Sequence, residues 1–444
     1  MRATTTRPGR TRAAFIAFTA AGALALGACS GDSGIPGESG DETEASGDGG
    51  DVTIRFSWWG SDERHQTTQE IIDLFEEKNP GITVVPDFTD WGGYWDKLAT
   101  TVAGGDTPDV LTHEERFIAD YANRGVLADL EGLDIDTSEI PENIVDSGRV
   151  DGELYGLATG VNAYAVVADP QVFADAGVDV PDDTTWTWED FVAVSGQISE
   201  AAGDGVWGVQ DIGFNEAGLN ILARQKGQTL YTEDGSLGVD AATVSEFFQI
   251  GLDLQENGGS PDGSRTTEIQ AAGPEGSLLG TNSGAMGVWW SNQLGALSSA
   301  SGHELELMRI PGESEFDRTG MYFKPAMFYS VSATTEHPEE SAMFVDFLLN
   351  DPEAAALQLT DRGLPSNLSV REAILGDLED ADARVAEFMA ELEDEIIDGP
   401  AVPPNGAGDV QDIITRINSE VLFGSMTPDE AAEAFLSQVE AATS

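Results

Sequence analysis

From residue 52 onward, the hydrophobic pattern alternates between short strand-like runs and longer helix-like runs. Val52 to Ser57 alternates apolar and polar positions and predicts a first strand that delivers Trp58 and Trp59 to its carboxyl end. Residues 63–78 carry apolar positions at helical spacing and stop at Asn79-Pro80-Gly81, which predicts a helix. Two further pairs follow, with strands at 82–85 and 109–111 and helices at 94–103 and through Tyr121. This alternation predicts an α/β fold with a parallel sheet.

The loops that follow parallel strands meet at one edge of a sheet, where such folds bind their ligands. The loops starting at Trp58, Asp87 and Thr112 are therefore expected to lie together. The C-terminal part of the chain has no internal repeat, but its amphipathic stretches predict helices at 339–349, 351–359, 380–397 and 427–439. We expect this helical part to cover a second lobe.

The first 29 residues have the pattern of a secretory signal. Four arginines between Arg2 and Arg12 precede an apolar run at 13–26, which is too short for a comfortable membrane span. Leu26-Gly-Ala-Cys29 resembles the lipobox of bacterial lipoproteins, in which the cysteine is lipidated. An ordinary signal peptide that happens to precede a cysteine is the alternative. Residues 30–51 are mostly Gly, Ser, Asp and Glu, a composition typical of a flexible linker.

Composition narrows the possible partners. The 444 residues exceed what one hydrophobic core usually supports, so two lobes are expected. With 21 basic and 80 acidic residues the formal charge is −59, which disfavours nucleic acid and anionic lipid surfaces as partners. Solubility explains this charge; a calcium-binding surface is the alternative, without a calcium-loop motif to support it. Cys29 is the single cysteine, so disulfides and thiolate metal clusters are excluded.

Several segments resemble, in order, the extracellular solute-binding proteins of ABC importers, in particular the carbohydrate-binding family that includes the maltose-binding protein. They are 75–84, 104–110, 121–127, 155–157, 162–164, 187–191, 284–292, 338–349 and 363–366. The resemblance implies a type II periplasmic-binding-protein-like fold, α/β, in which two lobes are joined by crossing segments and a sugar sits between them. It implies no cofactor.

The same resemblance implies a division of the chain: 1–28 signal peptide, 29–50 acidic linker, 51–162 lobe one, 163–283 lobe two, 284–325 a return to lobe one, and 326–444 lobe two with the C-terminal helices. In this division 286–290 is a strand of lobe one, and the chain crosses between lobes at 163–167 and again at 324–326.

Tryptophans provide the most specific indication of a ligand. A flat indole covers the apolar face of a sugar ring, while a few polar side chains bind its hydroxyl groups. The candidates are Trp58, Trp59, Trp91, Trp207, Trp289 and Trp290. Adjacent tryptophans in a strand point in opposite directions, so only one of Trp58 and Trp59, and one of Trp289 and Trp290, is expected to face the cleft. Packing explains Trp95, Trp186 and Trp188 better.

Polar candidates stand near the same strand ends and crossings. Asp62 and Arg64 follow the first strand, where the resembled family commonly places hydrogen-bonding side chains, and Glu114 follows the third. An ion pair on a helix surface is the alternative for Arg64 and Glu114. The remaining candidates each have an open alternative: Asn162 binds sugar or the hinge backbone, Tyr322 or Phe323 marks the other crossing, and Arg362 reaches the cleft or caps a helix.

We therefore expect a lipid-anchored receptor, monomeric and attached at Cys29 to the extracellular face of the cell membrane, that captures a carbohydrate and delivers it to an ABC permease. A surface lectin without transport function and a receptor for another solute are the alternatives. Enzyme motifs are missing: the four histidines are scattered, and no metal-site, P-loop or nucleophile-elbow pattern occurs. A glycosidase needs only two carboxylates, but the resemblance argues against it. The sequence leaves the sugar open, although no basic cluster is evident near the expected cleft, which argues against a sugar phosphate.

Overall fold

The protein is described here by a computed structural model that covers residues 52–203, 205–312, 314–378, 380–393, 395–396 and 399–443, without the side chain of Glu63. The predicted signal peptide, the linker and the lipidation site at Cys29 lie outside these residues. Among the described residues, none of the helices has the length and apolar composition that a membrane span needs.

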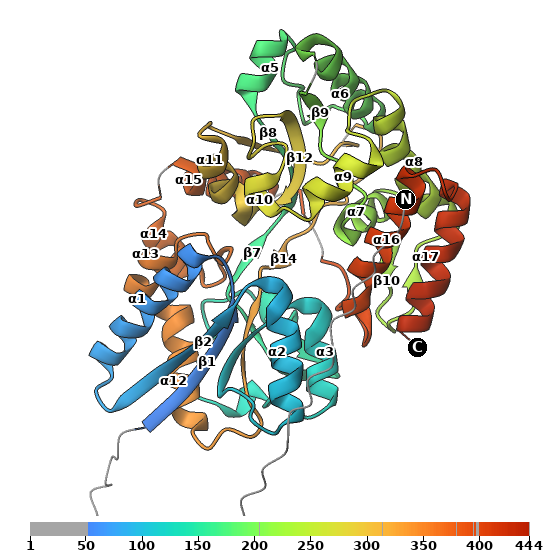
Figure 1. The fold of residues 1–444 in the computed structure, drawn as a ribbon. Helices are drawn as coiled ribbons and strands as arrows, with labels where there is room; N and C mark the ends of the chain where they lie inside the picture. Colours follow the sequence, from blue (N-terminus) through green and yellow to red (C-terminus); the bar gives the residue numbers. More distant parts are fainter. Residues whose placement is uncertain are drawn as a thin grey trace, which may run out of the picture. The chain divides into compact units, whose positions relative to one another are not determined.

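The first lobe is built on a five-stranded sheet with the order β2-β1-β3-β15-β6 (Figure 1). Its strands are β1 (Val52–Trp59), β2 (Ile82–Thr89), β3 (Val110–His113), β6 (Leu157–Ala158) and β15 (Phe328–Val331). The first three are parallel, and β15 and β6 are antiparallel to them. Its helices are α1 (Asp62–Lys78), α2 (Trp91–Ala103), α3 (Glu115–Asn123), α12 (Pro338–Asn350) and α13 (Pro352–Gln358). The predicted α/β alternation is confirmed.

Two N-caps start helices directly at the carboxyl ends of strands. Ser61 accepts a hydrogen bond from the backbone N–H of Arg64 at the start of α1, and Asp90 accepts one from Gly93 at the start of α2. A side chain that accepts from the first turn replaces the partner that the helix itself cannot supply. Because Asp90 caps α2, this helix begins at Trp91, three residues before its predicted start. This cap places the Trp91 indole beside the end of β1.

The second lobe is built on a four-stranded sheet with the order β13-β8-β12-β9. Its strands are β8 (Tyr164–Ala168), β9 (Trp207–Val209), β12 (Gly284–Trp290) and β13 (Glu306–Met308). The principal helices around it are α5 (Pro170–Ala176), α6 (Trp188–Ala202), α7 (Glu216–Gln225), α8 (Ala241–Glu256), α15 (Asp380–Leu392), α16 (Val410–Leu422) and α17 (Pro428–Ala442). The whole of β8 is buried, and α17 packs along α8.

Three short strands connect the two sheets. They form a sheet of their own with the order β14-β7-β16, made of β7 (Gly160–Asn162), β14 (Lys324–Pro325) and β16 (Leu364–Pro365). Figure 1 shows β7 and β14 running between the two lobes. The strands approach closely at Gly160, where a β-carbon would lie 2.6 Å from the carbonyl oxygen of Leu364. Only glycine fits such an approach.

The remaining elements are short. They are η1 (Leu130–Gly132), α4 (Glu142–Asp146), β4 (Arg149–Val150), β5 (Glu153–Leu154), β10 (Thr229–Tyr231), β11 (Leu237–Gly238), α9 (Gly263–Gln270), α10 (Gly273–Gly276), η2 (Ser291–Gln293), α11 (Leu294–Ser301), α14 (Leu368–Ile374) and η3 (Ala407–Asp409).

The path of the chain differs from the expected one at two strands. Residues 286–290 were expected in lobe one, but β12 pairs with β8 and β9 in the second sheet, because Ala285 and Met286 are buried in the core of that lobe. Residues after 326 were expected in lobe two, yet β15 pairs with β3 in the first sheet, where all four of its residues are buried. The first crossing is made by β7, since 164–168 is already a strand of the second sheet.

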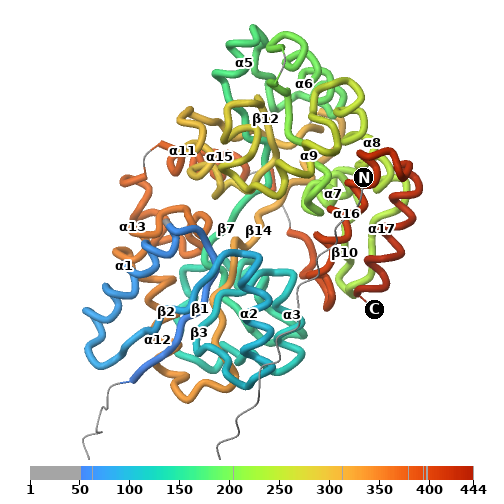
Figure 2. The backbone as a smooth tube through the Cα atoms, in the orientation of Figure 1, coloured from blue at the N-terminus to red at the C-terminus, as the bar shows by residue number. Residues whose placement is uncertain are grey.

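The C-terminal helices were all expected to cover the second lobe, but two of them pack on the first. Helices α12 and α13 pack against α1, and α12 also contacts β1. Figure 2 shows the orange segment of α12 beside the blue N-terminal strands. The rings of Phe344 in α12 and Phe75 in α1 meet at 4.9 Å, which joins the two helices in the core of the first lobe. Helices α15, α16 and α17 pack on the second lobe.

Candidate ligand-binding cleft

A cavity of about 480 Å³ opens where loops of both lobes and the crossing strands meet. Its wall comes from the end of β1, the first turns of α1, α2 and α3, strands β7, β12 and β14, the loop before α7, and α16. Cavities of this size hold small ligands. The expected convergence of the strand-end loops is thus present for the loops after β1, β2 and β3.

The two tryptophans that end β1 point in opposite directions. Trp58 is fully buried, stacks on Phe56 at 5.0 Å and donates its indole N–H to His65 Nδ1 at 3.1 Å. It therefore belongs to the core of the first lobe and does not line the cavity. Trp59 does line it, and its ring meets the exposed indole of Trp91 edge-on at 5.0 Å. Trp59 and Trp91 form an aromatic wall on the first lobe.

A second aromatic wall comes from β12. Both Trp289 and Trp290 line the cavity, so the expectation that only one of them would do so is wrong. Strand alternation stops here because Trp290 is the last residue of β12 and directly precedes the 3₁₀ turn η2. Tyr164, which also lines the cavity, meets the Trp290 ring at 4.9 Å.

The other tryptophans lie elsewhere. Trp207 pairs with Gly284, at the end of β12 opposite Trp290, and it does not line the cavity. Trp186 and Trp188 are buried in the core of the second lobe, which confirms their assignment to packing. Trp95 packs against Trp59 and stacks on Phe117 at 3.9 Å, behind the first aromatic wall.

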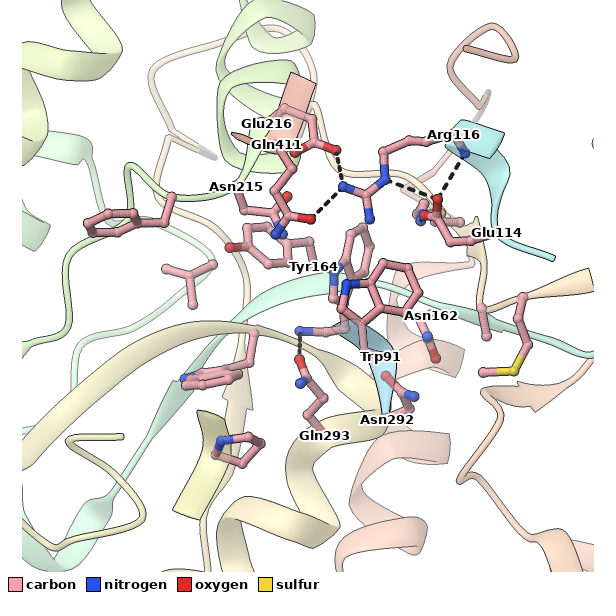
Figure 3. A pocket seen from close by; sticks show the side chains of 18 of the residues that line it. Trp91, Glu114, Arg116, Asn162, Tyr164, Asn215, Glu216, Asn292, Gln293 and Gln411 are labelled. Carbon is pink, nitrogen blue, oxygen red and sulfur yellow. Dashed lines mark hydrogen bonds and ion pairs between the residues drawn. The ribbon is translucent and has the colours of Figure 1, made fainter. Parts of the chain in front are cut away.

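A network of charged side chains borders the cavity (Figure 3). Glu114 accepts from Arg116 Nε at 3.0 Å and from Lys324 Nζ, while Arg116 Nη1 also lies 3.2 Å from Glu216 and donates to Gln411 at 2.6 Å. Burial would raise the pKa of Glu114, but the charges of Arg116 and Lys324 outweigh it and lower the pKa to about 2. Because Glu216 and Gln411 belong to α7 and α16, Arg116 joins helices of the two lobes.

The neighbouring carboxyl group behaves in the opposite way. Glu115 is buried behind this network, 3.6 Å from Lys324 Nζ. Burial raises its pKa to about 7, with the charge of Glu114 adding to the rise and Lys324 opposing it. Two adjacent glutamates are thus held in different protonation states near neutral pH.

Arg64 and Asn162 line the cavity, as expected for site residues, whereas Asp62 does not. Arg64 pairs with Asp361, with Nε 2.7 Å from Oδ2 and Nη2 2.9 Å from Oδ1. Asn162 is buried in β7, and its side-chain oxygen has no hydrogen-bond partner among the described residues. Asp62 is exposed at the first position of α1, since the side chain of Ser61 already caps that helix.

Two further candidates lie away from the cavity. Tyr322 lines an adjacent small cavity of about 40 Å³ and lies under the guanidinium of Arg224 at 5.3 Å. Arg362 is buried in the first lobe, where it donates to Thr68 Oγ1 at 2.8 Å and lies over Tyr329 at 6.0 Å. Its long side chain turns into the first lobe, so it does not reach the cleft.

Several lining residues were missed by sequence reasoning. They are Arg116, Gln210, Asp211, Phe214, Asn215, Glu216, Gln270, Asn292, Gln293, Lys324 and Gln411. Lys324 could have been predicted, because it is the first residue of the expected second crossing. Asn215 caps α7 and could have been found from that pattern. Gln411 carries no local signal, since it reaches the cavity only through the packing of α16. No three His, Cys, Asp or Glu side chains gather as a metal site requires within the part of the chain described.

The arrangement of two α/β lobes, crossing strands and a cavity between them defines the class of periplasmic-binding-protein folds. The model of the bacterial extracellular solute-binding protein family matches residues 59–355. The chain therefore belongs to this family, as its sequence motifs indicated.

The chain is also similar to individual proteins in sequence or in fold. An uncharacterized lipoprotein encoded in the oleD 5′ region of Streptomyces antibioticus is 26% identical over 330 residues, 71% of each chain. Among solved structures, an oligogalacturonide-binding protein of Yersinia enterocolitica in complex with saturated digalacturonic acid has a TM-score of 0.76 at 24% identity, covering 88% of this chain and all of that one. The acarbose-binding GacH receptor of Streptomyces glaucescens has a TM-score of 0.72 at 19% identity, covering 88% of this chain and 98% of that one.

Proposed function

We propose that this protein captures a sugar between its two lobes and delivers it to an ABC permease. The observation that carries the proposal is the pair of aromatic walls, Trp59 with Trp91 on the first lobe and Trp289 with Trp290 on the second, facing one cavity. Indole faces suit the apolar faces of sugar rings, and walls on both lobes allow a ring to be held between them. The two structural relatives described above bind sugars or a sugar analogue.

Polar groups around the walls complete a sugar site. In Figure 3, one side of the cavity carries Asn162, Asn292 and Gln293, and the other side carries Asn215, Glu216 and Gln411. Amide and carboxylate oxygens accept from sugar hydroxyl groups, and amide nitrogens donate to them. A few such groups between apolar walls fix a ligand's orientation.

Transport requires the lobes to move, because a permease must distinguish the loaded protein from the empty one. The crossing strands β7 and β14 are the places where rotation would occur. The protein would work as a monomer that binds substrate without chemistry. We further propose that Cys29 carries a lipid that holds the protein at the extracellular face of the cell membrane; the named lipoprotein among its relatives supports this anchor.

Tryptophan fluorescence tests the sugar-binding function, because at least four indoles border the cavity. The full chain in mild detergent is titrated with a panel of mono- and oligosaccharides, with amino acids as controls. A saturable change with one class of sugar, accompanied by a smaller radius of gyration in small-angle scattering, supports capture with closure. Saturable binding without any change in compactness would instead favour a surface lectin. A response only to amino acids would overturn the proposal.

A further inference from the structure

We infer that the cavity accepts uncharged sugars and rejects sugars that carry a carboxylate or a phosphate. This inference rests on the sugar-binding function proposed above and names the ligand class more narrowly. It comes from the state of the cations around the cavity. Arg64, Arg116 and Lys324 are the cationic side chains among its described lining residues, and carboxylates of the protein already hold all three.

Arg64 is held by a bidentate pair. Its Nε and Nη2 face the two carboxylate oxygens of Asp361 at 2.7 and 2.9 Å, and Nη2 also donates to the backbone oxygen of Asp361 at 2.8 Å. A guanidinium binds a ligand carboxylate or phosphate through the same fork of N–H groups. Since Asp361 occupies that fork, Arg64 lines the cavity without offering an anion site.

Arg116 and Lys324 share the carboxyl groups of three glutamates. Arg116 lies 3.0 Å from Glu114 and 3.2 Å from Glu216, while Lys324 pairs with Glu114 and lies 3.6 Å from Glu115. The side chains of Glu114, Arg116 and Lys324 are each less than 15% exposed, so water screens these pairs weakly. Even when Glu115 is protonated, the carboxylates of Glu114 and Glu216 match the two cations in number. A ligand anion entering here would meet no uncompensated positive charge.

Buried acceptor atoms of the lining residues support the same conclusion from hydrogen bonding. Asn162 Oδ1 and Glu216 Oε2 are buried at lining residues and have no partner among the described residues. A buried acceptor without a donor is costly, and a sugar hydroxyl can supply that donor. An ionised carboxylate or phosphate is itself an acceptor and would add like charge beside Glu216.

The sequence argument against a sugar phosphate relied on the lack of a basic cluster near the cleft. That lack is not the physical reason for rejecting an anionic sugar. Basic residues do gather at the cavity, but they are neutralised there. The Yersinia relative, solved with digalacturonic acid, shares the fold, so the fold alone does not fix the charge of the ligand. The charge preference of this chain resides in its own pairs.

Matched sugar pairs test the inference by calorimetry on the full chain in mild detergent. The probes are galactose with galacturonate, glucose with glucuronate, glucose with glucose 6-phosphate, and galactobiose with digalacturonate. The neutral member of any pair that binds is expected to bind at least about tenfold more tightly than the anionic member, because the anion would lie beside carboxylates without a free cation. Equal or tighter binding of an anionic member overturns the inference and leaves the sugar-binding function standing. If no sugar in the fluorescence panel or in these pairs binds, the proposed function and this inference both fail.

Asp361→Asn frees the fork of Arg64 while keeping the shape of its partner. In this variant the affinity for the anionic members is expected to rise at least about fivefold relative to the unaltered protein. Asp351→Asn is the matched control, because Asp351 pairs with Lys78 at 2.7 Å and does not line the cavity. It is expected to leave both classes of sugar unchanged. An equal gain in the two variants would show a general charge effect and contradict the role of Arg64. If Asp361→Asn does not fold, the comparison of neutral and anionic pairs still decides.

Discussion

Neighbouring residues of the same type play different roles at this cleft: one is buried in the core and the next lines the cavity. Ile54, Phe56 and Trp58 share the face of β1 that packs under α1 and α12, whereas Trp59 is on the other face. The alternation of side chains along the strand could therefore have predicted which tryptophan of this pair is buried. Trp58 is two residues from Phe56 and four from Ile54, so all three side chains lie on the same, buried face. The same reasoning fails for Trp289 and Trp290, because β12 ends at Trp290 and the 3₁₀ turn η2 follows directly.

Trp91 is the residue whose loss should separate binding from folding. Its indole is 37% exposed at the first turn of α2, so Trp91→Ala removes part of the aromatic wall with little effect on the core. We expect sugar affinity to fall about 10- to 100-fold, measured by calorimetry, with a small change in Tm. Trp58→Leu is the contrast: it should cost roughly 2–4 kcal/mol of stability and leave the affinity of the folded protein unchanged. Unaltered binding by Trp91→Ala would remove Trp91 from the site.

Glu115 makes stability depend on pH in a direction that is unusual for a carboxyl group. Burial raises its folded pKa from 4.5 to about 7, so between these values the folded state holds a proton that the unfolded state releases. The free energy of unfolding should therefore fall as pH rises from about 4.5 to 7. The difference in the free energy of unfolding between Glu115→Gln and the unaltered protein should shift by roughly 1–3 kcal/mol in favour of the variant as pH rises from 4.5 to 8. Urea unfolding at several pH values measures this shift.

Glu114→Gln provides the comparison for that experiment. Arg116 and Lys324 hold the pKa of Glu114 down at about 2, so its contribution is present above pH 4.5 and lost as pH falls toward 2. This variant should lose stability at both pH 5 and pH 8. If the difference between Glu115→Gln and the unaltered protein were the same at pH 5 and pH 8, Glu115 would be ionised in the fold and the assignment would be wrong.

At the scale of elements, strands and helices were largely predictable, but their assignment to lobes was not. Periodicity located β1, α1 and α12 to within a few residues, because each buries one face. Which sheet receives a strand depends on pairing partners far away in sequence. The runs at 284–290 and 328–331 are short and show no regular alternation of apolar and polar residues that would indicate the partner. Polar residues such as Gln411 reach the cleft through helix packing alone, which leaves no local pattern to read.

Arg116 connects α3 of the first lobe with α7 and α16 of the second, so its removal should loosen the lobes. In Arg116→Gln, Glu114 and Glu216 lose their shared partner, and the unliganded protein is expected to become less compact in small-angle scattering. Arg149→Gln is the matched control, because Arg149 pairs with Glu131 and Asp146 within one lobe. Identical scattering curves for Arg116→Gln and the unaltered protein would show that this contact does not hold the lobes together.

For the whole molecule, the balance of 21 basic and 80 acidic residues means self-repulsion at neutral pH. The folded state concentrates this charge more than the unfolded chain does. Ionic strength should therefore act on stability more strongly than in a protein of balanced charge.

Salt should raise the thermal stability of the chain. Raising NaCl from about 0.01 M to about 1 M shortens the screening length from roughly 30 Å to roughly 3 Å, which weakens repulsion among surface carboxylates. We expect Tm at pH 7, measured by circular dichroism, to increase by several degrees. At pH 4, where many carboxylates are protonated, the increase should be smaller. A Tm that falls with salt at pH 7 would mean that attractive pairs outweigh the repulsion.

The crossing strands also have a consequence for how the chain folds as it is made. Strand β3 pairs on one side with β1, and its other partner, β15, begins only at Phe328, after the four strands of the second sheet have been synthesised. Until then, the second edge of β3 has no neighbouring strand, which leaves a template for pairing between chains. Neither lobe is a continuous piece of sequence, so no single uninterrupted segment contains one lobe alone. The first sheet can therefore be completed only after more than 330 residues have been synthesised.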